Sequence, residues 1–199
     1  MRLRRPPALS QSRVGRYRRA MAVTDLRIAL FSGNYNYVRD GANQALNRLV
    51  GSALRAGAAV RIYSPTIEKP AFEPTGDLVS IPSWSMPGGR GEYRLGKGLS
   101  ADVRADLERF NPNVVHVSAP DIVGHRAVAW ARKRGTAVIA SHHTRFETYP
   151  RYYHLGFTEP LLIALQRRFY NRFDQVMVPS DSMGALLQQW GITAPMGTW

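Results

Sequence analysis

Short apolar runs alternate with longer amphipathic stretches along most of the chain. The apolar runs are continuously hydrophobic, which is typical of strands covered on both faces of a sheet. They predict strands at 26–31, 60–64, 78–81, 114–117, 137–140 and 175–178. The longer stretches carry apolar residues at helical spacing and predict helices at 42–55, 100–110, 122–134, 158–173 and 182–190. Segments 65–77 and 82–98 are rich in Pro and Gly and are predicted to be loops.

This order of elements predicts an α/β fold. Successive strand–helix–strand units with right-handed crossovers build a doubly wound, mostly parallel, Rossmann-like sheet. Two helices present apolar stripes that we expect to face it, one formed by Leu46, Leu49, Val50 and Leu54 and the other by Leu161, Leu162, Leu165, Phe169 and Phe173. If Leu49 is fully buried, Leu49→Ala should lower the free energy of unfolding by about 2–5 kcal/mol.

Composition narrows the class of protein. The chain has 199 residues, which suits one domain, and its hydrophobic share of 44% is that of a folded protein. It contains no cysteine, which excludes disulfides, iron–sulfur clusters, cysteine-ligated zinc and cysteine nucleophiles. No apolar run is long enough to cross a membrane.

The positive charge is concentrated at the start of the chain. Of a net charge of +13, residues 1–22 supply seven arginines and no acidic residue. We interpret this segment as a basic, disordered tail, and residues 23–199 as the folded domain. An organelle transit peptide, a nucleic-acid-binding arm, or translation that starts at Met21 are the alternatives.

The segments after the predicted strands are where a site is expected. In open α/β sheets, ligands bind beyond the carboxyl ends of the strands, where the strand order reverses. Polar and aromatic residues gather in these segments, at 32–41, 118–121, 141–154 and 179–182. The loops at the opposite edge, such as 56–58 and 133–135, are short and chemically plain. We therefore expect one polar, aromatic-lined cleft at the carboxyl edge.

The loop after the first strand is the first candidate. Gly33 permits close backbone approach, and the free N–H groups near Gly41 could bind an anion such as phosphate. Asn34 and Asn36 offer donors and acceptors, and Tyr35 and Tyr37 offer flat faces that suit sugar rings. The alternative is a loop that only caps its own helix through Asp40.

The segment after the fifth strand is the second candidate. Its His142-His143-Thr144 run ends the strand, and we expect His143 to face a ligand. A zinc site made by His142, His143 and Glu147 is disfavoured, because adjacent strand residues point to opposite faces. The rim of the cleft, facing a polar ligand or a membrane surface, is expected to include Arg145, Glu147, Tyr149, Tyr152 and Tyr153. The alternative is that the three tyrosines only pack against the protein.

The sequence lacks complete versions of three common motifs of nucleotide-binding proteins and hydrolases. Residues 91–98 approach a P-loop, but they lack the Ser or Thr that binds magnesium and follow no strand. The dinucleotide fingerprint is missing after the first strand, and no acid ends the second strand, which argues against NAD. The chain also lacks the G-x-S-x-G elbow of α/β-hydrolases.

Four stretches together resemble the N-terminal half of a GT-B fold, family 4 glycosyltransferase, of the lipid mannosyl- and sulfoquinovosyl-transferase subgroup. They lie at 28–50, 110–128, 141–156 and 173–183, and the resemblance covers residues 26–195. It implies that Gly33 and segment 34–41, with Arg39, Asp40 and Gly41, approach the donor diphosphate and the acceptor. It also implies that His143 lies by the transferred sugar, with Thr144 beside it and Ser180 near the cleft. Asp121 is expected at the same cleft because it belongs to the segment after the fourth strand.

The resemblance implies transfer, with retention, of a hexose from a nucleotide sugar to a lipid or glycan acceptor, with no metal and no further cofactor. In that family a second domain binds most of the donor and carries an E-x7-E pair, which this sequence lacks. We therefore expect an acceptor-side domain with little activity alone, in the cytoplasm, with peripheral contact at the inner face of the membrane. No nucleic-acid partner is expected. The alternatives are a non-catalytic truncated remnant and a nucleic-acid-binding protein that acts through its tail.

Overall fold

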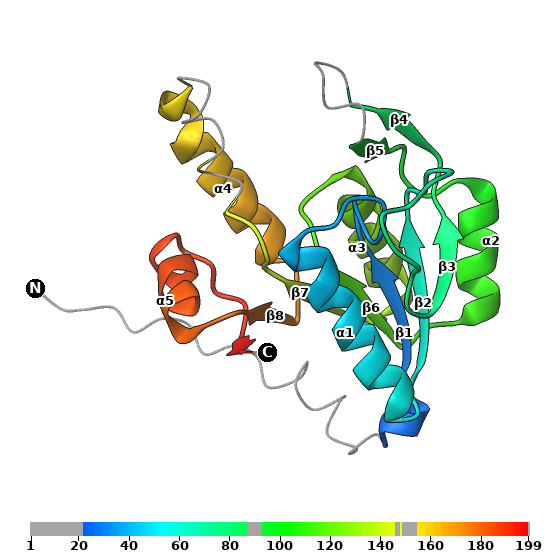
Figure 1. The fold of residues 1–199 in the computed structure, drawn as a ribbon. Helices are drawn as coiled ribbons and strands as arrows, with labels where there is room; N and C mark the ends of the chain where they lie inside the picture. The colour runs from blue at the N-terminus through cyan, green and yellow to red at the C-terminus, as the bar shows by residue number, and fades with distance from the viewer. Residues whose placement is uncertain (1–21, 87–92, 146–147, 149–154, 199) are drawn as a thin grey trace, which may run out of the picture.

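A parallel sheet with the strand order β3-β2-β1-β6-β7-β8-β9 forms the centre of the computed structural model (Figure 1). The structure describes residues 22–86, 93–145, 148 and 155–198. Every described pair of neighbouring strands in this sheet is parallel. The strands are β1 (Arg27–Phe31), β2 (Ala59–Ser64), β3 (Asp77–Ser80), β6 (Val114–Val117), β7 (Ala137–Ser141), β8 (Gln175–Val178) and β9 (Met196–Thr198). The strand order reverses between β1 and β6, so the doubly wound α/β fold is confirmed.

Helices cover both faces of the sheet. They are α1 (Gly41–Arg55), α2 (Ala101–Phe110), α3 (Ile122–Arg134), α4 (Glu159–Tyr170) and α5 (Asp181–Gln189), with short 3-10 helices at Val23–Asp25 and Gly156–Thr158. Neighbouring residues of β1 point to opposite faces of the sheet, and each face has its own hydrophobic core. Phe31 belongs to one core with residues of α2 and α3, and Leu30 belongs to the other core with Leu46 of α1. Thus α1 lies on one face, and α2 and α3 lie on the other.

Polar side chains and glycines set the ends of the helices. Asp40, Ser100, Asp121 and Ser180 each accept a hydrogen bond from a backbone N–H of the helix that follows. Gly57, with φ of 94°, follows α1, and Gly135, with φ of 68°, ends α3. Both φ values lie in the left-handed region that favours glycine. These signals explain why the predicted helix boundaries agree with the structure to within a few residues.

Three short strands were not predicted. The expected loop 82–98 contains an antiparallel pair, β4 (Ser83–Ser85) and β5 (Arg94–Gly96), and β9 lies near the end of the chain. Each is three residues long. A segment that short has too few alternating positions to show a strand period. The hairpin matters because Arg94 lies beside the candidate site.

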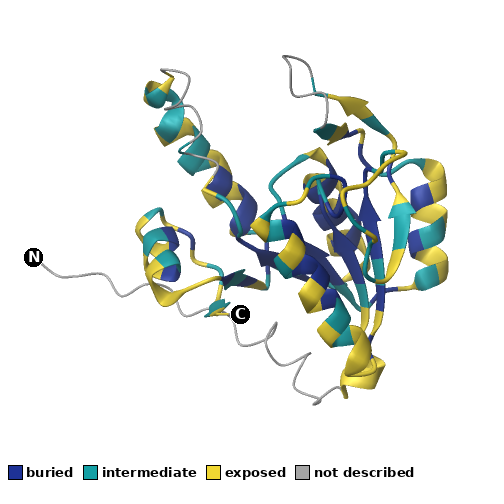
Figure 2. Ribbon diagram, in the orientation of Figure 1, coloured by how far each residue is buried: buried dark blue, intermediate teal, exposed yellow. Residues whose placement is uncertain are grey.

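The predicted apolar stripes are only partly buried. Leu46 and Val50 are buried on α1, but Leu49 is 40% exposed and Leu54 is 38% exposed. On α4, Phe169 is buried and Leu161 is 62% exposed, because this helix extends away from the body of the sheet (Figure 2). The expectation that Leu49 is buried is therefore wrong. The apolar stripe of α1 is wider than the part of the helix that contacts the sheet, so residues at its edges are exposed to solvent.

No helix in the described part of the chain is long and apolar enough to cross a membrane. The basic tail predicted at the start lies outside the described residues, apart from Ala22.

Candidate active site

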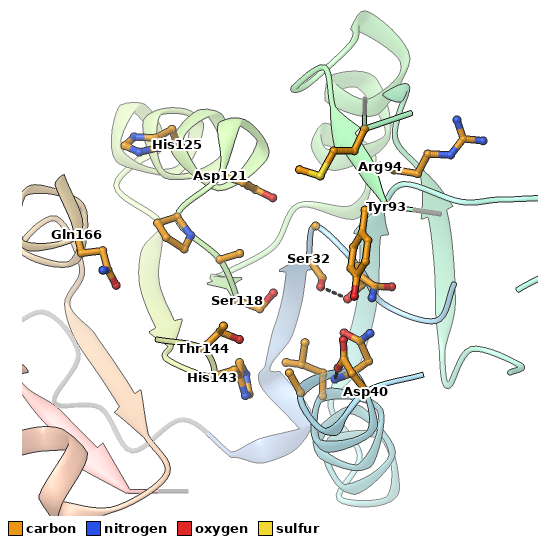
Figure 3. A pocket seen from close by; sticks show the side chains of 18 of the residues that line it. Ser32, Asp40, Tyr93, Arg94, Ser118, Asp121, His125, His143, Thr144 and Gln166 are labelled. Carbon is orange, nitrogen blue, oxygen red and sulfur yellow. Dashed lines mark hydrogen bonds between the residues drawn. The ribbon is translucent and has the colours of Figure 1, made fainter. Parts of the chain in front are cut away.

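A cavity of about 1070 Å³ opens at the carboxyl edge of the sheet, where the strand order reverses. Its walls come from the loops after β1, β6 and β7, from the β4–β5 hairpin and from α4 (Figure 3). This is the edge at which the sequence predicts a cleft, and parallel α/β sheets bind ligands there.

Two serines at strand ends line the cavity, and a third ends the neighbouring strand. Ser32 follows β1 and Ser118 follows β6, and both line the cavity. They lie at one level, because the N–H of Ser118 donates to the carbonyl of Phe31 at 3.0 Å. Ser141 ends β7, the next strand. Small hydroxyl side chains leave room above the strand ends and offer both donors and acceptors.

Gly33 and Asp121 meet across the switch point. A Cβ on Gly33 would lie 2.6 Å from Oδ2 of Asp121, so only glycine leaves this carboxylate its space. The other oxygen, Oδ1, accepts the backbone N–H of Gly124 at 2.7 Å and so caps α3. Burial raises the pKa of Asp121 to about 6. A glycine is therefore needed at position 33 so that the backbone can lie close to the side chain of Asp121.

The raised pKa of Asp121 gives a testable dependence of stability on pH. The stabilising contribution of the protonated carboxyl is complete below the unfolded-state pKa of 3.8 and is lost as the pH rises through about 6. Compared with wild type, Asp121→Asn should therefore become more stable by up to about 3 kcal/mol between about pH 4 and pH 8, as followed by chemical denaturation. Asp40→Asn, at the cap of α1, controls for the loss of a capping carboxylate. A pH-independent difference would contradict the burial of Asp121.

The loop after β1 is held by its own side chains. The Tyr37 hydroxyl donates to the carbonyl of Gly33 at 2.7 Å and accepts the N–H of Arg94 at 3.2 Å. Burial raises the pKa of this phenol. Asn34 Oδ1 accepts the N–H of Val38 at 3.3 Å, and Asp40 accepts that of Asn43 at 2.8 Å. Gly33, Asn34, Tyr37 and Asp40 all line the cavity, and the capping role considered for Asp40 is confirmed.

Two residues expected in the cleft are core residues instead. Tyr35 is fully buried, and its hydroxyl donates to the carbonyl of Thr75 at 2.7 Å. Asn36 is buried, and its Nδ2 donates to the carbonyl of Phe72 at 3.0 Å. Both side chains tie the loop after β1 to segment 72–75. The expectation that they present a face and polar atoms to a ligand is wrong, since both side chains turn inward and donate to backbone carbonyls of segment 72–75.

Four further predicted residues do not line the cavity. Arg39 is exposed and its Nη2 donates to the carbonyl of Ala71 at 3.1 Å. Gly41 is the first residue of α1, and Ser180 caps α5, with its hydroxyl accepting the N–H of Met183 at 3.3 Å. Arg145 is exposed outside the cavity. Glu147, Tyr149, Tyr152 and Tyr153 lie outside the described residues, and their proposed contact with a ligand stays a prediction.

The two adjacent histidines point to opposite sides, as expected at a strand end. His142 is buried, and its Nδ1 lies 3.2 Å from the hydroxyl of Tyr170. His143 lines the cavity together with Thr144. Burial, reinforced by the neighbouring His142, lowers the pKa of His143 to about 4. The ring is therefore neutral near pH 7, so it acts as a hydrogen-bonding group rather than as a cation.

Several cavity residues were missed by the sequence analysis. They include Tyr93 and Arg94 of the hairpin region, His125 of α3, and Leu162, Gln166, Arg168 and Arg172 in and after α4. The Nη1 of Arg172 lies 3.1 Å from Nδ1 of His125, and burial together with this arginine lowers the pKa of His125. Nothing in the local pattern separates these arginines from solvated helix residues. Only the packing of α4 beside the switch point brings them to the cavity.

The described residues include no group of three or more His, Asp or Glu side chains that could hold a metal ion. The expectation of metal-free chemistry is not tested by this and stays a prediction.

The strand order and the cavity at its reversal define a Rossmann-like ligand-binding domain. The family model described as Glycosyltransferase Family 4 matches residues 39–199, and the chain belongs to this family. A solved structure of sucrose-phosphate synthase from Thermosynechococcus elongatus has the same fold, with a TM-score of 0.61 at 13% identity over 86% of this chain and 47% of that one. The resemblance to a GT-B family 4 glycosyltransferase is confirmed.

Two curated relatives are similar in sequence. Sulfoquinovosyl transferase SQD2 of Arabidopsis thaliana is 30% identical over 101 residues, which is 50% of this chain and 20% of that protein. The GDP-mannose-dependent alpha-mannosyltransferase of Mycolicibacterium smegmatis is 23% identical over 165 residues, 79% of this chain and 43% of that protein. The chain therefore spans less than half the length of either relative.

Proposed function

We propose that this chain forms the acceptor side of the active site of a retaining glycosyltransferase, which moves a hexose from a nucleotide sugar to a lipid or glycan acceptor. The observation that carries the proposal is the cavity at the switch point, where neutral His143 lies with Gly33 and Asp121. The two curated relatives carry glycosyltransferase names, one with GDP-mannose as donor.

The polar groups of the cavity suit this reaction. Transfer with retention develops positive charge at the sugar carbon and negative charge on the leaving diphosphate. Arg168 and Arg172 line one wall and could meet phosphate oxygens, while His143, Ser118 and Gln166 offer neutral hydrogen bonds for sugar hydroxyls. A complete reaction would also need groups that hold the nucleotide, which this proposal assigns to a donor-binding part outside the cavity. No metal or further cofactor is part of the proposal.

The surface next to the cavity suits a lipid acceptor. Phe157 is 79% exposed in the 3-10 helix before α4, and the exposed side chains of Leu161 and Leu165 follow it at four-residue spacing along α4. Leu165 also lines the cavity, and Arg168 lies one turn further on. Such an apolar stripe could hold acyl chains while the headgroup enters the polar cavity. We therefore include peripheral contact with the inner face of a membrane in the proposal.

The test is a chimera in which this chain replaces the matching part of the mycobacterial mannosyltransferase. The donor-binding part of that enzyme then supplies GDP-mannose, and this chain supplies the acceptor side. We expect mannose transfer to a lipid acceptor or a soluble glycoside by the folded chimera, and little transfer by this chain alone. The parent enzyme is the positive control.

Robust turnover by the chain alone would contradict the acceptor-side assignment. A folded chimera that transfers mannose to neither class of acceptor would contradict the proposed function. Salt-dependent DNA binding that disappears when residues 1–22 are deleted would favour the nucleic-acid alternative instead.

A further inference from the structure

A chain of three hydrogen-bonding side chains leads from the interior of the sheet to the cavity. Nε2 of His116, on β6, lies 2.9 Å from Oγ of Ser141, at the end of β7. The same Oγ lies 2.8 Å from Nε2 of His143. Ser141 thus contacts both imidazole rings through the same nitrogen of each.

The two inner residues of this hydrogen-bonded series, His116 and Ser141, are held in place by the central strands of the sheet. His116 is 4% exposed and Ser141 is 2% exposed, and β6 and β7 pair directly between β1 and β8. His116 is in register with Leu30 and with Ile139, so it lies in the centre of the sheet. His143 is two residues beyond Ser141, on the same side of the sheet and at the cavity.

The single hydroxyl proton couples the two rings. A serine hydroxyl donates one hydrogen bond and accepts others through its oxygen. If it donates to one Nε2, the other Nε2 must carry a proton and donate to Oγ. Both bonds can therefore form when one Nε2 or both carry a proton, because Oγ can accept from two N–H groups, but they cannot both form when neither Nε2 is protonated.

Both rings are suited to such an arrangement, because both are neutral near pH 7. Burial lowers the pKa of His116 to about 3, and burial also lowers that of His143 to about 4. A neutral imidazole carries one N–H, so its tautomer is set by the hydrogen bond that each nitrogen makes.

We infer that Ser141 and His116 are positioning residues, which fix the tautomer and the ring orientation of His143 at the cavity. His143 thereby presents one defined donor or acceptor pattern to a ligand rather than a mixture of two. This inference rests on the proposed function only for its consequence in sugar transfer. The fixed tautomer itself is a property of the chain without ligand.

The test is the ¹⁵N spectrum of the imidazole nitrogens, recorded on the ¹⁵N-labelled chain near pH 7.5. In the wild type, we expect each ring to show a single tautomer, with Nε2 of at least one ring of the protonated type. In Ser141→Ala, the His143 nitrogens should move towards the averaged shifts of a tautomer mixture. Ser141→Thr keeps the hydroxyl and should retain the wild-type pattern.

Two results would overturn the inference. One is an unprotonated Nε2 in both rings of the wild type, or the averaged shifts of a tautomer mixture for His143, a measurement that needs no variant to fold. The other is an unchanged His143 spectrum in folded Ser141→Ala, which a merely structural role for the serine would give.

Transfer by the chimera gives a separate result. Ser141→Ala should lower kcat by about 10-fold, comparable with the loss of groups that orient metal-bound imidazoles. It should cause no further loss when His143 is already alanine, since the serine acts through that ring. If the ¹⁵N pattern holds but His143→Ala leaves transfer unchanged, the positioning stands and the proposed function fails. If the pattern is missing while His143→Ala abolishes transfer, only the positioning fails.

Discussion

Replacing His143 with alanine is expected to lower sugar transfer by about 100-fold, which is typical for the loss of one preorganised hydrogen-bonding group at a reacting centre. The neutral ring lines the cavity and is held by Ser141. Its removal therefore takes away a defined polar group without leaving a buried charge. The measurement is kcat for mannose transfer by the chimera, together with thermal unfolding, which should change little.

Arg145→Ala is the matched control. Arg145 lies two residues along the same segment, but it is exposed and does not line the cavity. We expect this variant to retain most of the transfer activity. An equal loss in both variants would mean that the segment matters only for folding or docking. Full activity in His143→Ala would remove His143 from the site.

Leu46→Ala should lower the free energy of unfolding by about 2–5 kcal/mol, whereas Leu49→Ala should change it by no more than about 0.5 kcal/mol. Leu46 is 2% exposed and packs with Leu30 and Ile62 beneath α1, while Leu49 is 40% exposed. Both substitutions remove the same atoms from one helix, so they have nearly the same effect on helix propensity. The difference between them isolates burial.

Denaturant unfolding of the two variants gives the comparison directly. Similar losses of stability would contradict the placement of α1 on the sheet. A larger loss of stability in Leu49→Ala than in Leu46→Ala would mean that α1 is rotated about its axis, so that Leu49 faces β1 and β2 in place of Leu46.

The long elements could be predicted from the sequence because their signals are local. Continuous apolar runs mark the buried strands, and capping residues such as Asp121 and Gly135 mark both ends of α3. The burial of particular leucines could not be predicted, because it depends on where each helix meets the sheet. Leu46 and Leu49 show the same chemistry and periodicity, and only the position of α1 distinguishes them.

The site could be predicted as an edge of the sheet, but not residue by residue. His143 and Gly33 follow strands directly, so the strand period and the topology place them at the cavity. Tyr35 and Tyr37 share residue type and loop, yet one is in the core and the other lines the cavity. Irregular backbone has no period from which to read that difference. Arg172 reaches the cavity only through tertiary packing, which leaves no local signal.

The most direct test of the central claim is an amide chemical-shift titration of this chain with acceptor probes. The probes are short-chain diacylglycerol, short-chain phosphatidylinositol and methyl α-mannoside. We predict saturable shifts for at least one probe, centred on Gly33, Ser118, Asp121 and His143 around the cavity. A folded chain that showed no cavity shifts with any probe, or saturable shifts only on the surface of α2, would contradict an acceptor site in this cavity.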